Sequence, residues 1–139
     1  MFKYLRTLNT EFHPTSVEVF LSHANEDELD GCSAGTICSV SDGILTPYYK
    51  SGTVMYLTLV EKEEDTEKPV SCIRLTANMV LEADVMPDTD SSKLGIGAAV
   101  SLGYDDDSKA VGISTTGTPR FEIIDNSAIM DNKVIVAVL

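Results

Sequence analysis

Short apolar runs rich in Val, Ile and Thr recur along the whole chain, and turn-forming residues separate them. Such runs are typical of β-strands, whereas an amphipathic helix repeats its apolar residues at a spacing of about 3.6 over a longer window. Only residues 25–30 have helical character, and one helical turn or a loop fits them equally well, because Gly31 ends the segment. The expected strands are residues 17–21, 35–40, 44–48, 53–60, 70–75, 80–85, 97–104, 110–115, 120–124 and 133–139.

This succession of short strands predicts an all-β fold, a small antiparallel barrel or sandwich. Residues 53–60 are expected to form a central strand, because both of its faces carry large apolar side chains. The charged residues 61–68 are interpreted as the solvated tip of the following hairpin, with a regulatory acidic patch as the alternative. Residues 1–16 are less regular and are expected to form an extended N-terminal arm, ahead of a single β domain over residues 17–139.

The charge balance limits the partners of the chain. It has 10 Lys and Arg against 22 Asp and Glu, a net charge of −12. Proteins that neutralise phosphates do so with clustered Lys and Arg, and here the basic residues are scattered, so nucleic acid is not an expected partner. No apolar run approaches the roughly 18 residues of a membrane helix, and a secretory signal is not recognisable. We therefore expect no membrane partner and synthesis in the cytoplasm.

The sequence offers no metal site that fits its spacing. Cys32, Cys38 and Cys72 are expected to be reduced thiols, most of them buried. Five residues separate Cys32 from Cys38, more than the roughly two to four that separate paired zinc ligands. The run of acids at 105–107 is interpreted as an exposed hairpin turn, because adjacent side chains of an extended chain alternate faces and the spacing of a calcium loop is missing.

Two glycine-containing segments invite a nucleotide interpretation. Residues 95–100 begin like a dinucleotide-binding fingerprint, but a strand rather than a helix is expected after them. Residues 112–118 resemble a phosphate loop of a β-barrel nucleotide hydrolase, yet Arg120 is the one nearby cation in sequence and a strand entering a turn explains the same residues. Neither His13 nor His23 lies in a nucleophile–base signature. We expect no catalytic residue, no cofactor and no enzyme activity.

Several segments together resemble the tailed-bacteriophage head decoration (capsid cement) protein family. The resemblance covers about residues 29–139 and includes the glycine-punctuated segment 29–43 and the strands flanking the charged tip. Its clearest part is the C-terminal third. There a Gly-x-x-Val-x-Leu strand at 97–102 leads through an acidic turn to Ala110–Ile113, then to a strand that begins at Phe121 and to a Val-rich final strand.

This resemblance implies a β-barrel or β-tulip-like sandwich, often trimeric, that sits on the outer surface of the phage head and braces the major capsid protein. The protein would then be found in the virion. Another virion component, of the tail, neck or spike, is the alternative, and a β-barrel nucleotide hydrolase is a more distant one. The apolar residues of the arm are candidate partner contacts through strand addition, or they complete the core of the domain: Phe2, Tyr4, Leu5, Leu8 and Phe12.

Overall fold

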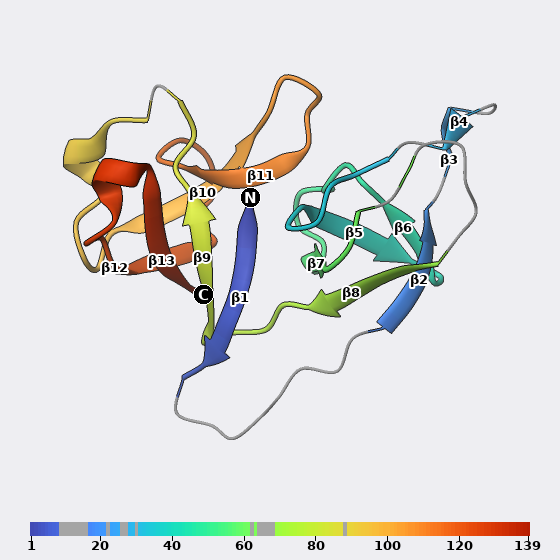
Figure 1. Cartoon of the computed structure of the whole chain (residues 1–139), viewed down its shortest axis with the longest axis horizontal. Coiled ribbons are helices and arrows are strands. Elements are labelled where there is room, and N and C mark those ends of the chain that lie inside the picture. The colour runs from blue at the N-terminus through green and yellow to red at the C-terminus, as the bar shows by residue number, and fades with distance from the viewer. Residues whose placement is uncertain are drawn as a thin grey trace. The chain divides into compact units, whose positions relative to one another are not determined.

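The computed structural model describes residues 1–8, 17–21, 23–25, 28–29, 31–61, 63, 69–87 and 89–139 (Figure 1). Within these residues the chain is built from β-strands and contains no α-helix, which confirms the predicted antiparallel all-β fold class. Two short 3-10 turns interrupt the strands, η1 (Ser91–Lys93) and η2 (Ile129–Asp131). Neither is long or apolar enough to cross a membrane.

The backbone contacts divide the chain into two compact units. The terminal unit comprises residues 1–13, 76–107 and 111–139, and the central unit comprises residues 14–75 and 108–110. Strand periodicity gives no sign of this division, because a chain that leaves one sheet and later returns to it looks locally like any other strand. Whether residues 17–139 unfold as one cooperative domain stays a prediction.

The terminal unit is a curled sheet in which strands from both ends of the chain lie together. The order of its strands is β1 (Phe2–Thr7), β9 (Met79–Asp84), β13 (Lys133–Val138), β12 (Phe121–Asp125), β10 (Ala99–Tyr104) and β11 (Ala110–Ser114). Val85, directly after β9, forms a parallel bridge with Ile113 of β11, and the Met86 N–H donates to the Ile113 carbonyl at 3.1 Å. This closing seam brings the sheet back on itself, as in a small barrel.

The centre of the terminal unit is β9, which pairs with β1 on one edge and with β13 on the other. Met79, Val80 and Leu81 are all fully buried, so successive side chains on both faces of the strand are covered. The rings of Phe2 and Phe121 meet in the same core at a centroid distance of 5.5 Å. Other large, fully buried side chains of this unit include Leu94, Val100, Ile113 and Ile123.

The N-terminal residues are not an irregular arm along their whole length. Residues Phe2–Thr7 form β1, which is antiparallel to β9 with a bulge between Tyr4 and Arg6. The strand is stable there because Phe2 is buried and β9 supplies the backbone partners. Residues 9–16 of the expected arm lie outside the described residues.

The central unit is a closed ring of strands. β5 (Ile37–Ser41) pairs with β6 (Ile44–Thr46), β6 with β2 (Val17–Leu21), β2 with β8 (Val70–Arg74), β8 with β7 (Tyr56–Thr58), and β7 again with β5. Only the β2–β6 pair of this ring is parallel. β3 (His23–Asn25) and β4 (Glu28–Leu29) pair separately, where a helical turn or loop was expected, and residues 26, 27 and 30 lie outside the described part.

Residues 53–60 form a much shorter strand than the sequence predicts. The preceding turn extends through Thr53, whose N–H and Oγ1 bond the Lys50 carbonyl at 3.1 and 2.6 Å, and β7 contains only Tyr56–Thr58. Val54 and Leu59 are 41% and 42% exposed, so the prediction of a strand covered on both faces was wrong. The hairpin itself is present, because β7 and β8 are antiparallel neighbours, but most of its charged tip lies outside the described residues.

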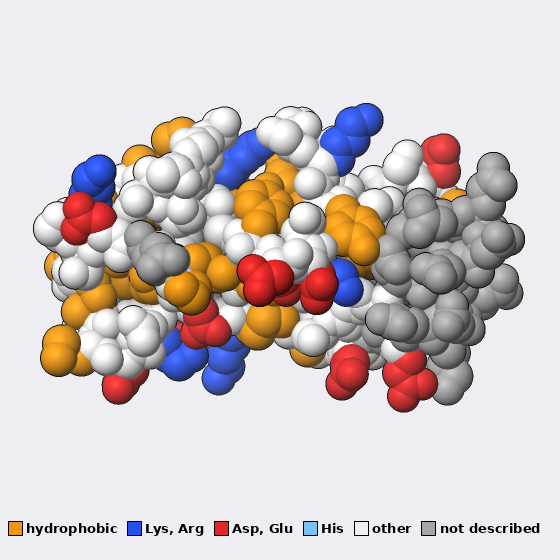
Figure 2. Space-filling view, turned by 90° about the horizontal axis from the view of Figure 1, so that it is seen from above, with side chains coloured by type: hydrophobic (Ala, Val, Ile, Leu, Met, Phe, Trp, Pro, Cys, Tyr) orange, Lys and Arg blue, Asp and Glu red, His pale blue; other side chains and the backbone are white. Residues whose placement is uncertain are grey.

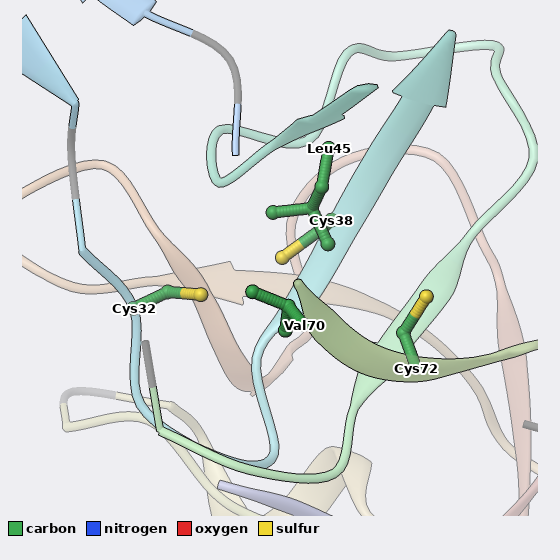
Figure 3. Close-up of a cluster of buried hydrophobic side chains, with 5 residues drawn as sticks. All are labelled: Cys32, Cys38, Leu45, Val70 and Cys72. Carbon is green, nitrogen blue, oxygen red and sulfur yellow. The ribbon is translucent and has the colours of Figure 1, made fainter. Parts of the chain in front are cut away.

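The interior of the central unit is small and contains all the cysteines. Cys32, Cys38, Leu45, Val70 and Cys72 form one buried cluster (Figure 3), with Val40 and Tyr56 packed against it. Beside it the fully buried Thr58 hydroxyl donates to the Ser33 carbonyl at 2.9 Å and accepts from the Thr36 N–H at 3.0 Å. These bonds fasten to β7 the loop that follows Cys32 and precedes β5.

Candidate functional site

The structure assigns different roles to the proposed partner contacts of the N-terminal segment. Phe2 is only 4% exposed and belongs to the core, as the alternative interpretation expected. Tyr4, Leu5 and Leu8 are half-buried; the Tyr4 hydroxyl shares a hydrogen bond with Thr7 Oγ1 at 2.8 Å, and the Leu8 N–H donates to the Asn78 carbonyl at 2.9 Å. Phe12 lies outside the described residues. Tyr4, Leu5 and Leu8 therefore keep part of their surface available to a partner, whereas Phe2 does not.

The edge strand β1 is poorly suited to strand addition along its full length. Leu5 is the extra residue of its bulge, and the exposed Lys3 and Arg6 stand on either side of that bulge. Charged side chains and bulges are common devices that protect sheet edges from pairing with other chains. The bulge and the two charged side chains therefore interrupt the backbone edge that a continuous ladder with another chain would need.

A cluster of charges fixes the first residue to β9 and β13. Lys133 Nζ lies 2.7 Å from Asp84 Oδ1 and 3.8 Å from Glu82 Oε1, and the Met1 amine also bonds the Asp84 carboxylate. Burial alone would raise the pKa of Asp84, but the hydrogen bonds from Lys133 and the Met1 amine outweigh it and lower that pKa. The Asp84 hydrogen bond and charge raise the pKa of Lys133 in turn. Because every charge here has a partner, the cluster is suited to holding β1 in place and not to proton transfer.

Large apolar side chains reach solvent in both units. In the terminal unit Ile96 is 70% and Met130 91% exposed. The Gly97 N–H donates to the Ile123 carbonyl at 2.8 Å and the Asn126 amide to the Leu94 carbonyl at 3.1 Å, so the loops carrying Ile96 and Met130 are joined to the same end of the sheet. Figure 2 shows hydrophobic side chains at several places on one face, with charged groups between them. The other exposed large apolar residues in the described part of the chain are Ile44, Val54, Leu59, Val60, Tyr104 and Leu139.

The acidic turn between β10 and β11 is a local structure. The Asp107 N–H donates to Asp105 Oδ1 at 3.0 Å, the hydrogen bond of an Asx turn. Across the described residues, no group of three or more His, Cys, Asp and Glu side chains is placed to hold a metal ion.

The two glycine-containing segments have structural explanations. Gly97 has a φ of 89°, and β10 begins two residues later at Ala99, so a strand and not a helix N-terminus follows this glycine. In the second segment, Ser101 Oγ donates to the carbonyls of Ser114 and Thr116, which fixes the turn after β11. Gly112 is needed for close packing, because a Cβ there would lie 2.6 Å from the Asp84 carbonyl oxygen and 2.8 Å from Met86 Sδ. Sequence reading did not identify this role, since Asp84 and Met86 lie far away along the chain.

The three cysteines are reduced and buried, as their sequence context predicts. Hydrogen bonding with Cys32, together with burial, raises the pKa of the Cys38 thiol far above its ordinary range, and burial raises the pKa of Cys72 to about 11. In Figure 3 the sulfur atoms of Cys32 and Cys38 point toward one another, whereas Cys72 lies beyond Val70. A thiol that stays protonated is a poor nucleophile at neutral pH, so this cluster has no resting thiolate at Cys38 or Cys72.

Comparison with known proteins gives no match for the chain. It matches none of the protein-family models, and neither the curated proteins nor the solved structures contain a significant match. Similarity therefore shows no family, and a proposed function depends on the residues and geometry described above.

Proposed function

We propose that the chain is a head decoration protein of a tailed bacteriophage, which binds the outer surface of the assembled capsid and stabilises the shell of the major capsid protein. The observation that carries this proposal is the order of elements over residues 97–139. The Gly-x-x-Val-x-Leu strand, the acidic turn, the Phe121 strand and the Val-rich final strand are the segments in which the sequence resembles that family. They form β10 to β13 of one curled sheet, which is consistent with a common structural unit.

The chemistry of the described residues supports a role in binding. The charged cluster at Asp84 is internally neutralised, the Ser101 hydroxyl bonds backbone carbonyls of the turn after β11, and the cysteines are enclosed in a core. The chain as a whole carries a charge of −12, which favours solubility and suits a protein on the outside of a particle that never contacts the packaged DNA. Such a protein acts through the complementarity of its surface to the shell.

The exposed apolar side chains are the best candidates for that contact. Met130 and Ile96 extend from loops at one end of the terminal unit, and they are the two most exposed of the large apolar residues that the structure describes. Binding as a homotrimer on a capsid symmetry axis would multiply modest contacts of this kind by avidity. The partners in this proposal are the major capsid protein and two further copies of the chain.

A binding assay with capsids tests the proposal. Purified protein is mixed with expanded heads of the phage that encodes it, and bound protein is measured after sedimentation, together with the temperature at which the heads release DNA. We expect saturable binding and a higher release temperature. The double variant Ile96→Ser and Met130→Ser should bind at least tenfold more weakly, with Val54→Ser and Val60→Ser in the central unit as the matched control.

The outcomes separate the function from the choice of surface. If the control variant loses binding and the first does not, the contact lies on the central unit. If the unmodified protein neither binds heads nor protects them, the decoration function is rejected. Labelling of whole virions with a specific antibody, with signal confined to the tail, would instead favour a tail, neck or spike component.

A further inference from the structure

The thiols of Cys32 and Cys38 lie in one buried cluster inside the central unit. Within this cluster their sulfur atoms point toward one another in Figure 3. Cys38 belongs to β5, and Cys32 lies six residues earlier in the loop that Thr58 fastens to β7. Because Thr58 bonds the backbone of both Ser33 and Thr36, the loop between the two cysteines is fastened to β7.

A positive charge lies beside this pair. Lys109 Nζ donates to the carbonyl of Gly31, the residue before Cys32, and it stands 6.0 Å from the centre of the Tyr48 ring. An ammonium group near a thiol stabilises the thiolate, the form that reacts with oxidants. Cys72 belongs to the same buried cluster but lies beyond Val70 in Figure 3, away from the facing sulfur atoms.

We propose that Cys32 and Cys38 form an intramolecular disulfide when the protein meets hydrogen peroxide, and that Cys72 stays reduced. The Cys32 thiolate attacks one peroxide oxygen, the O–O bond breaks, and Cys32 becomes a sulfenic acid with release of hydroxide, which takes up a proton as water. The Cys38 sulfur then attacks the sulfenic sulfur, and the S–O bond breaks as the S–S bond forms. The Cys38 proton leaves with the departing hydroxyl as a second water. The two cysteines are oxidised and one peroxide molecule is reduced to two waters.

The disulfide would reinforce the central unit by joining the loop before β5 to β5 itself. Only five residues separate the cysteines, so the loop that it closes is short and the loss of unfolded-chain entropy is modest. We expect the melting temperature of the oxidised protein to rise by roughly 5 °C. A protein that passes from a reducing cytoplasm to an oxidising exterior would thereby become more stable without a new partner.

Mass spectrometry of the full chain tests the pairing. The folded protein is treated with hydrogen peroxide, then unfolded and alkylated without reduction, and the number of alkylated thiols is counted. We expect a fall from three to one, a mass loss of two hydrogen atoms, and a cross-linked peptide pair that contains Cys32 and Cys38. Dithiothreitol should restore all three thiols. Oxidation of the chain in urea should give mixed pairings, because only the native fold selects this pair.

Matched variants show how Cys32, Cys72 and Lys109 each contribute to formation of the cross-link. Cys72→Ala should leave the cross-link intact, whereas Cys32→Ala should abolish it. Lys109→Met keeps the apolar stem but removes the charge, and it should slow the cross-link several-fold. A cross-link that includes Cys72, disulfide-linked dimers, or three alkylatable thiols after treatment would overturn the proposal. Peptide mapping of the unmodified chain gives this answer even if a variant fails to fold.

Discussion

Replacing Gly112 by alanine should open the closing seam of the terminal unit. The new Cβ would lie 2.6 Å from the Asp84 carbonyl oxygen, well inside ordinary van der Waals contact, and a backbone oxygen cannot rotate away. The end of β9 must therefore move away from β11, which weakens the bridge between Val85 and Ile113. Overpacking costs about 1–3 kcal/mol, and a weakened hydrogen bond adds about 1 kcal/mol. We expect Gly112→Ala to lower the free energy of unfolding by about 3 kcal/mol.

A second glycine of the seam provides an internal comparison. A Cβ at Gly103 would collide chiefly with the Met86 side chain, which can change rotamer, and would lie 3.1 Å from the Ile113 backbone. Gly103→Ala should thus cost only about 1 kcal/mol. In a double-mutant cycle, Met86→Ala should relieve most of that cost. It should relieve less of the cost of Gly112→Ala, because the contact with the Asp84 carbonyl remains.

Guanidinium unfolding followed by far-UV circular dichroism measures these differences. Gly95→Ala is the matched control, because a Cβ there meets nothing within 4 Å. Because the new Cβ causes no clash and alanine lowers the conformational entropy of the unfolded chain, the free energy of unfolding should stay unchanged or rise by up to about 1 kcal/mol. If Gly112→Ala were as stable as Gly95→Ala, the close approach of β9 and β11 described here would be wrong.

Two further predictions concern β1. Phe2→Ala should destabilise the protein by about 3 kcal/mol, because it empties a core site against Phe121. The control Lys3→Ala on the same strand should change the free energy of unfolding by no more than about 0.5 kcal/mol in the same assay. If the two variants had equal effects, Phe2 would not be a core residue and would again be a candidate partner contact. The lowered pKa of Asp84 means that its contribution is present above the ordinary value of 3.8 and is lost as the pH falls through the folded-state pKa. Melting temperatures recorded between about pH 5 and pH 2 should therefore fall less steeply for Asp84→Asn than for the unmodified protein. Asp106→Asn, in the exposed turn, is the control. Parallel curves for Asp84→Asn and the unmodified protein would contradict the ion pairs of Asp84 with Lys133 and the Met1 amine.

Much of the strand pattern could be predicted from local residue types. Val70–Arg74 and Lys133–Val138 were predicted within a residue of their bounds, since β-branched runs between turn residues leave few alternatives. The predictions for β1 and β7 were less accurate. β1 depends on the edge that β9 offers it, and β7 is shortened by the turn that extends through Thr53. Both effects come from partners that a local pattern does not contain.

The candidate sites also contain some features that the local sequence predicts and others that depend on tertiary partners. The sequence identified the cysteines as buried thiols and the acidic run as a turn, because residue type and spacing suffice for those inferences. It did not separate Phe2 from Tyr4 and Leu5, since burial depends on which strand lies opposite. Nor did it indicate that the thiols of Cys32 and Cys38 face each other while Cys72 stands apart.

The sequence by itself determined the all-β class, the strong negative charge and most strand positions, because these follow from backbone propensity, side-chain alternation and composition. Only the tertiary structure decided that both ends of the chain share one unit while residues 14–75 form another. It also decided that Gly112 serves the contact with Asp84 and Met86. Strand pairing joins residues far apart in the chain, and the free energy that selects one partner over another comes from packing that exists only after the sheet has formed.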